Sequence, residues 1–174
     1  MNSFFSIDEL TALGLKSFGQ NVFISRFARI YSPEKMTIGD NVRIDDFCIL
    51  SGEIILGSFI HISAYCALYG KFGIEMEDNT GLSPRCTVFS ATDDFTGDYL
   101  IGPMVNAETT NVQGGKVRFR KFSQIGAGCV VMPGITVGEG ATVGAMSFVN
   151  KSIDPWQVHA GVPAKFIKNR KRII

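Results

Sequence analysis

The sequence has few charged residues and no long apolar run. Asp, Glu, Lys and Arg make up 19% of the 174 residues, and the formal net charge is only +1. Globular domains carry roughly 25% charged residues, and this balance argues against a disordered chain or an extended nucleic-acid-binding surface. The longest unbroken apolar run covers residues 64–69. A membrane helix needs about 18 such residues, so no membrane span is expected.

Several catalytic signatures are also missing. The chain contains no phosphate-binding loop, no GxGxxG, no HExxH and no GxSxG. Its two histidines, His61 and His159, are too few for a three-histidine zinc site, and its four cysteines form no CxxC pair. No metal requirement is therefore predicted. The first residues lack the charged start and long apolar region of a signal peptide, which favours a cytoplasmic location.

Glycine and β-branched residues are plentiful, and aliphatic residues recur every six positions. The 19 glycines are well above the average share. One aliphatic series comprises Ile38, Ile44, Leu50, Leu56, Ile62, Leu68 and Ile74, and it continues after a two-residue slip through Met76, Leu82 and Val88. A second series comprises Ile125, Val131, Val137, Val143 and Val149. Glycine often follows the aliphatic residue directly, which indicates short strands separated by tight turns.

A period of six fits neither a helix nor an open sheet. It fits an all-β solenoid, a parallel β-helix with three short faces, in which three hexads complete one triangular coil and the aliphatic residues of successive coils stack inside. The cysteines test this assignment of hexad positions independently, because only aliphatic residues were used to set it. All four share the fifth position of a hexad, namely Cys48, Cys66, Cys86 and Cys129. That position also points inward, so small buried core residues are predicted there rather than a metal or disulfide site.

Three segments interrupt the repeat within what we expect to be a single domain, residues 1–174. Residues 1–16 contain a capping-box spacing followed by two leucines, which predicts a short helix that caps one end of the solenoid. Residues 91–116 lack the period and form a long loop, and such loops are usually functional. From Pro155 the repeat stops, so residues 155–174 are expected to form a turn and a basic helical or extended tail.

Few side chains are suited to proton transfer. His61 lies between two inward positions, so its imidazole is expected on the outer wall, either as a general base or as an ordinary surface histidine. Asn79 follows three hexads later and either orients that ring or a substrate, or is a turn residue. Asp93 and Asp94 open the loop. A carboxylate there either holds the histidine tautomer, or hydrogen-bonds an acceptor, or belongs to an Asp-rich turn.

Residues 125–151, with the sequence IGAGCVVMPGITVGEGATVGAMSFVNK, and the closing AGVPAK at 160–165 resemble the hexapeptide-repeat acetyltransferases. The match covers nearly the whole chain and is closest to the maltose and galactoside acetyltransferase branch and its relatives in bacterial surface-polysaccharide clusters. The resemblance implies a left-handed β-helix. It also implies a homotrimer, with active sites between neighbouring subunits and acetyl-CoA lying along the groove.

The resemblance also assigns cofactor-binding positions. Ala127 and Ala145, which lie three hexads apart, would contact the pantetheine arm through backbone groups, and their small side chains would let the cofactor approach the main chain. Lys151 and Lys168 would lie by the phosphates and adenine of CoA, and Arg170 is a further candidate. Their positive charge suits the cofactor's phosphate groups.

The sequence departs from that branch in one respect, because the long loop contains no histidine. His61 is therefore expected to supply the base, with Asp93 or Asp94 positioning the acceptor or the imidazole. The predicted function is acetyl-CoA-dependent O-acetylation of a sugar in surface-polysaccharide (O-antigen or capsule) biosynthesis. One alternative is N-acetylation of a nucleotide-linked amino sugar, where an amine needs less help from a base. A second alternative, of another class, is a non-catalytic β-helix scaffold.

Overall fold

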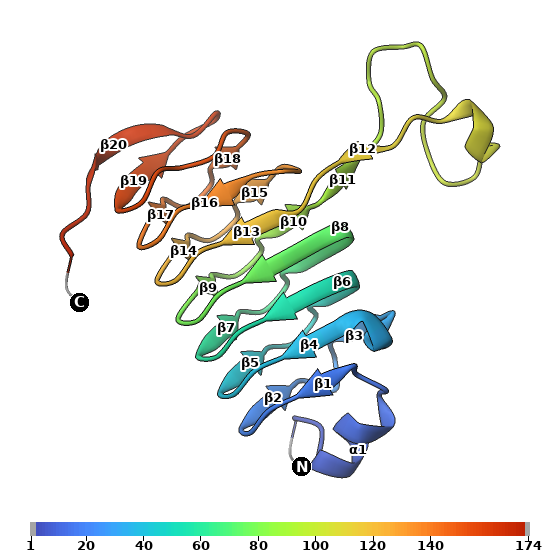
Figure 1. The fold of residues 1–174 in the computed structure, drawn as a ribbon, viewed down its shortest axis with the longest axis vertical. Helices are drawn as coiled ribbons and strands as arrows, with labels where there is room; N and C mark the ends of the chain where they lie inside the picture. The colour runs from blue at the N-terminus through green and yellow to red at the C-terminus, as the bar shows by residue number, and fades with distance from the viewer. Residues whose placement is uncertain (1–2, 173–174) are drawn as a thin grey trace.

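The chain folds into a stack of triangular coils, as Figure 1 shows. The structure is a computed structural model and describes residues 3–172. Short parallel strands of successive coils pair with one another, so that each face of the triangle is a parallel sheet. The predicted all-β solenoid, a left-handed parallel β-helix, is confirmed.

We number the three faces so that each coil runs through faces 1, 2 and 3 in turn, although the first strand of the chain, β1, lies on face 3. Face 1 comprises β2 (Val22–Ile24), β5 (Val42–Ile44), β7 (Ile60–Ile62), β9 (Gly81–Leu82), β14 (Gln124–Ile125), β17 (Thr142–Val143), β19 (Gln157–Ala160) and β20 (Lys165–Asn169). Face 2 comprises β3 (Arg29–Tyr31), the first parts of β6 (Ile49–Leu56) and β8 (Ala67–Met76), β10 (Thr87–Phe89), β15 (Val130–Val131) and β18 (Phe148–Val149). Face 3 comprises β1 (Ser17–Phe18), β4 (Met36–Ile38), the second parts of β6 and β8, β13 (Val117–Phe119) and β16 (Thr136–Val137).

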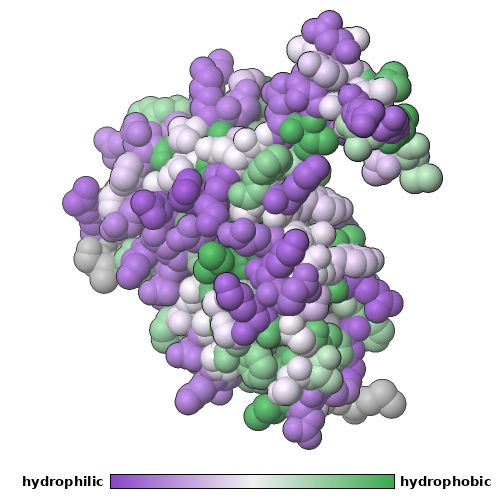
Figure 2. All heavy atoms as spheres, turned by 45° about the vertical axis from the view of Figure 1, so that its right-hand side comes forward, coloured by the Kyte–Doolittle hydropathy of each residue, from purple (hydrophilic) through white to green (hydrophobic). Residues whose placement is uncertain are grey.

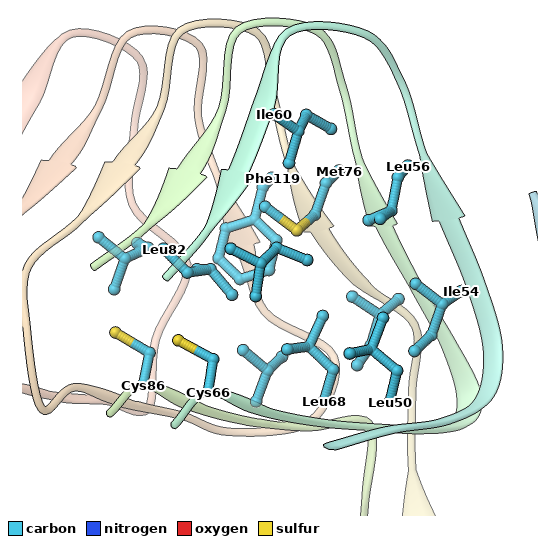
Figure 3. Close-up of a cluster of buried hydrophobic side chains, with 14 of the residues drawn as sticks. Leu50, Ile54, Leu56, Ile60, Cys66, Leu68, Met76, Leu82, Cys86 and Phe119 are labelled. Carbon is cyan, nitrogen blue, oxygen red and sulfur yellow. The ribbon is translucent and has the colours of Figure 1, made fainter. Parts of the chain in front are cut away.

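The core is the column of inward-pointing side chains inside this triangle. Every member of the two six-residue series is buried, with exposures of 4% or less. Figure 3 shows aliphatic side chains from the three faces meeting around Phe119, with Cys66 and Cys86 side by side at one corner. Because each coil covers the apolar side chains of the next, the core is continuous along the stack.

The four cysteines are fully buried, as predicted, and they lie at the corner between faces 1 and 2, which we call the cysteine corner. Each thiol donates to a carbonyl oxygen of the adjoining coil. The acceptors of Cys48, Cys66, Cys86 and Cys129 are the carbonyls of Ser63, Ser83, Gly126 and Gly144, at 3.1–3.2 Å. The thiols therefore satisfy backbone oxygens that the tight corners leave without a strand partner.

Coil length varies, and every long insertion lies at one corner. The coil from Ile44 to Ile62 spans three hexads, whereas the coil from Ile62 to Leu82 is longer by two positions. The extra residues fall where β8 turns from face 2 to face 3, around Lys71–Gly73. The 3-10 helix η1 (Pro33–Lys35) lengthens an earlier coil at the same corner, and the loop of residues 91–116 leaves the next coil there. We call this the loop corner.

The two ends of the solenoid are covered differently. Helix α1 (Ile7–Ala12) begins at Ser6 with a capping box to Glu9, and Glu9 also pairs with Arg26 of the first coil. At the other end the repeat runs further than predicted, because β19 still pairs in parallel with β17 beyond Pro155. The tail then turns back as β20, antiparallel to β19. Within the described residues, no helix is long and apolar enough to cross a membrane.

The buried ring of Phe119 provides a test of this core. Phe119→Ala removes a side chain that is only 1% exposed and leaves a cavity between coils, so we expect the free energy of unfolding to fall by about 3–5 kcal/mol. Phe95→Ala, at a loop ring that is 75% exposed, is the matched control and should change little. Chemical denaturation of both variants measures the difference, and equal midpoints would contradict the packing described.

Candidate functional site

A cavity of about 1030 Å³ lies at the loop corner, between the coils and the loop. In Figure 2 the loop stands clear of the coils as an arm, with a notch beneath it. A two-stranded stem, β11 (Ala91–Thr92) paired with β12 (Gln113–Gly114), carries this arm, and a second 3-10 helix, η2 (Ala107–Thr109), lies within it. The cavity therefore has a floor of coil corners and a roof of loop residues.

Two lysines from the coil insertions line this cavity. Lys35 ends η1 and Lys71 lies in the bulge of β8, so both belong to the residues that depart from the hexad. Both are exposed. Glu53 also lines the cavity, and its carboxylate lies 3.4 Å from the Lys116 ammonium. Two lysines in the lining of a cavity of this size are suited to an anionic group such as a phosphate.

The two neighbouring aspartates of the loop have different surroundings. Asp93 lines the cavity and is half-buried. Asp94 points away into the base of the loop, is only 7% exposed, and accepts hydrogen bonds from Thr96, Asn111 and Gln113. These hydrogen bonds, led by those from Thr96, lower the pKa of the Asp94 carboxyl. Of the two, Asp93 is the carboxylate that can meet a ligand in the cavity.

His61 lies on the outside of face 1, as predicted, with its side chain about half exposed. Its Nε2 atom lies 2.7 Å from Asp45, which also accepts from Arg43 at 2.6 Å. Partial burial raises the pKa of Asp45, but the hydrogen bonds from Arg43 and His61 outweigh it and leave that pKa below its ordinary value. The carboxylate that contacts the His61 imidazole within one chain is therefore that of Asp45. Neither Asp93 nor Asp94 of the loop contacts it.

Asn79 does not lie over His61. The residue opposite His61 in the next coil is Gly81, because the longer coil shifts the register by two residues. Asn79 instead occupies the corner between faces 3 and 1 with a left-handed backbone (φ 60°), and its amide donates to the Ser58 carbonyl at 2.9 Å. Of the two alternatives that the sequence left open for Asn79, the structure therefore supports the turn residue, because the longer coil shifts Asn79 away from His61.

Ala127 and Ala145 lie at equivalent positions of neighbouring coils on the cysteine corner. The backbone amide after Ala145 donates to the Ala127 carbonyl at 2.8 Å, so the two coils approach closely there. One coil earlier, Ser83 occupies the position next to this pair, since its amide donates to the Ile125 carbonyl at 2.9 Å. Ser83 is a residue that the aliphatic period did not single out.

The three predicted cationic cofactor residues lie at different places. Lys151 follows β18 near the loop corner, and Lys168 is exposed on β20. Arg170 lies at the corner between faces 3 and 1, where its guanidinium donates to the carbonyls of Phe122 and Gly140 at 3.1 and 2.9 Å. Lys165, at the start of β20, lies opposite Ala160 and so is nearer to the alanine pair than Arg170.

Comparison with known proteins agrees with this architecture. Residues 119–151 match the model of the bacterial transferase hexapeptide (six repeats) family. Over 167 residues the chain is 38% identical to a dTDP-4-amino-4,6-dideoxy-D-glucose acyltransferase of Escherichia coli, covering 94% of this chain and 87% of that protein. The chain belongs to the hexapeptide-repeat acyltransferase family. The resemblance of its repeats to this family is thereby confirmed, and it is an acyltransferase.

Solved structures of AntD, an N-acyltransferase from Bacillus cereus, are similar to this acyltransferase over 99% of its length, and 92% of the AntD chain is covered. One, a serine-to-cysteine variant in complex with dTDP-4-amino-4,6-dideoxyglucose and coenzyme A, has a TM-score of 0.96 and 50% identity. Another, in complex with dTDP and 3-hydroxybutyryl-CoA, has a TM-score of 0.96 and 51% identity. A third is an alanine variant of an aspartate ten residues after that serine.

The hydrogen bonds of Arg170 provide a test of its part in this acyltransferase. Arg170→Ala leaves two corner carbonyls without a charged donor, so we expect a loss of about 1–3 kcal/mol in the free energy of unfolding. Lys168→Ala, on the exposed strand two residues earlier, should change it by no more than about 0.5 kcal/mol. Denaturant titration compares the two variants. A larger loss for Lys168→Ala would contradict the structural part given to Arg170.

Proposed function

We propose that this acyltransferase moves an acyl group from acyl-CoA to the amino group of a nucleotide-linked amino sugar. The observation that carries the proposal is the loop-corner cavity, which is lined by Lys35 and Lys71 together with the acidic residues Asp93 and Glu53. The Escherichia coli and Bacillus cereus relatives act on or bind a dTDP-linked 4-amino sugar, and the Bacillus cereus enzyme binds CoA. N-acylation of a nucleotide-linked amino sugar is one of the two alternatives to O-acetylation that the sequence left open.

The cavity suits such an acceptor in size and charge. A volume of about 1030 Å³ is at the large end of small-molecule sites, as a nucleotide joined to a sugar requires. Lys35 and Lys71 would neutralise the diphosphate, and the sugar amine would then lie toward Asp93 on the stem of the loop. The ring of Tyr69, which stacks on Phe89 at 5.3 Å, offers an apolar surface beside the lysines.

Asp93 is the proposed base. The chain contains a single serine and aspartate pair with the ten-residue spacing of the two substituted AntD residues, namely Ser83 and Asp93. The amine nitrogen attacks the thioester carbonyl, the Asp93 carboxylate removes a proton from that nitrogen, and the C–S bond breaks to release CoA as its thiol after protonation. Backbone amides near Ala127 and the Ser83 hydroxyl would stabilise the oxyanion.

Ser83 and Asp93 lie at different corners of one chain. Strand β10 runs between them, and the span from Cys86 to Ser90 alone is about 13 Å at the usual rise of a strand. One chain therefore does not bring both side chains to one reacting atom. We propose that the site forms where the loop corner of one subunit meets the cysteine corner of the next, in a homotrimer.

Two uncovered apolar surfaces support this assembly. At the cysteine corner, the exposed rings of Phe27, Phe47 and Tyr65 stack in a ladder at 5.7 and 5.0 Å, and Arg85 caps it. The loop exposes further apolar side chains, among them Met104, which is 94% exposed. A neighbour that covers the ladder would lie beside Ser83, which is two residues from Arg85. Face 3 instead carries ion pairs typical of a solvated surface.

Acylated amino sugars are suited to surface polysaccharides, and the reduced, buried cysteines suit a cytoplasmic enzyme. His61 with Asp45 remains the second candidate for the base, and it would serve a hydroxyl acceptor better than an amine. The scaffold alternative has no support from the loop-corner cavity.

Steady-state kinetics with acyl-CoA and dTDP-4-amino-4,6-dideoxyglucose tests the proposal. We expect Asp93→Asn to lower kcat about 10²- to 10⁴-fold, because a general base contributes that factor, and to leave CoA affinity nearly unchanged. His61→Asn should lower kcat less than tenfold, a change of at most about 1.4 kcal/mol in the barrier. Release of the CoA thiol measures turnover.

The acceptor panel includes the matching 4-hydroxy sugar nucleotide. Turnover of the hydroxyl compound alone, together with a large loss in His61→Asn and none in Asp93→Asn, would favour O-acylation with His61 as base. Failure to bind CoA in calorimetry would revive the non-catalytic scaffold.

A further inference from the structure

The Asp94 carboxylate joins the two ends of the long loop. We call them its legs: the outgoing leg begins at Asp94, and the returning leg ends at Gln113. Its Oδ1 atom accepts from the Thr96 amide at 2.9 Å and from the Thr96 hydroxyl at 2.6 Å, which ties down the outgoing leg. Its Oδ2 atom accepts from Asn111 Nδ2 at 2.7 Å and from Gln113 Nε2 at 3.1 Å, which ties down the returning leg. One side chain thus closes a loop of sixteen intervening residues, 95–110.

We propose that Asp94 is a positioning residue that holds Asp93 toward the cavity. The proposal rests on the proposed function, in which Asp93 is the base. The backbone of Asp93 lies between the β11 stem and the hydrogen-bonded Asp94, so both neighbours of Asp93 are held. A misplacement of about 1 Å can cost about 10²-fold in rate.

The geometry explains why this position requires a carboxylate rather than an amide. Four N–H or O–H donors converge on two oxygens, and no donor is needed from the residue itself. An asparagine keeps one oxygen for Thr96, but its NH₂ group then faces the NH₂ groups of Asn111 and Gln113. The returning leg would lose both bonds to the carboxylate, and hydrogen bonds to a charged acceptor are stronger than those between neutral groups.

The other acidic residues of the loop do not share these contacts. Glu108 is exposed, and its backbone amide donates to the Asn106 side chain, which caps η2. Asp98 is exposed and lies 3.4 Å from the Thr96 hydroxyl, at the limit of a hydrogen bond. Glu108→Gln is therefore a matched control: it removes a loop charge without opening the junction between the two legs.

Hydrogen exchange and kinetics on the full-length enzyme together test the proposal. In Asp94→Asn we expect the amides of residues 95–112 to exchange at least about tenfold faster, with exchange in the coils unchanged. We expect kcat/KM for the amino sugar to fall about 10²-fold, while the acid limb of its pH profile, which protonation of the base produces, persists. Asp93→Asn should show the reverse, with unchanged loop exchange and loss of the acid limb.

Exchanging the carboxylate of Asp94 with the amide of Asn111 tests the direction of the hydrogen bond between them. Combining Asp94→Asn with Asn111→Asp gives the new amide a carboxylate acceptor on the returning leg, so we expect part of the lost protection and activity to return. Unchanged exchange and activity in Asp94→Asn would overturn the proposal. So would loss of the acid limb with a normally protected loop, because Asp94 would then be the base. A wild-type enzyme that acylates no amino sugar would refute the proposed function, whereas the exchange measurement would still test the loop closure itself.

Discussion

Each coil can bury its apolar side chains only against the coils on either side, and this constraint governs the rest of the structure. The inward residues recur every six positions and lie at equivalent heights in successive coils, so residues cannot be added inside a face without breaking the stack. Additions are tolerated at a corner, where the chain already leaves the sheet. In this chain the helix η1, the bulge at Lys71 and the long loop all use the same corner.

The concentration of insertions at one corner produces the cavity of the candidate site. Residues that do not pack in the core can carry charge. Lys35, Lys71 and Asp93 are such residues. The cysteine corner has the opposite character, because its tight turns and small residues keep the backbone close to the surface beside Ala127 and Ala145. A cavity lined by charged residues and a corner whose backbone lies near the surface suit the two substrates of an acyl transfer, one to each corner.

Much of the fold could be predicted from the sequence because the six-residue period of aliphatic residues marks the positions that are buried. The six-residue series, the inward cysteines and the outward His61 all follow from one phase, and all agree with the structure. The two-residue slip could be predicted, but its place could not, since the period puts it between Ile74 and Met76 whereas the extra residues lie around Lys71–Gly73. The end of the solenoid was also misplaced, because β19 keeps its pairing without keeping the hexad.

The site was less predictable than the fold. Asp93 and Asp94 are adjacent residues of the same type. Only the hydrogen bonds that Asp94 accepts from residues 96, 111 and 113 distinguish its surroundings from those of Asp93. Ser83 carries no signal in the aliphatic period, because it occupies a corner position that many polar residues would fit. Lys35 and Lys71 are far apart in the chain, and the spacing of the insertions was the one signal that could have brought them together.

The claim that two subunits share one site can be measured most directly by mixing two inactive variants. Asp93→Asn removes the proposed base at the loop corner, and Ala145→Trp places a bulky ring on the exposed surface of the cysteine corner. If each site takes one corner from each of two neighbouring chains, co-expressed mixed oligomers contain some sites with both corners intact. The account predicts that acyl transfer returns in those mixtures. Mixed oligomers, verified by native mass spectrometry, that stay as inactive as either variant alone would contradict it.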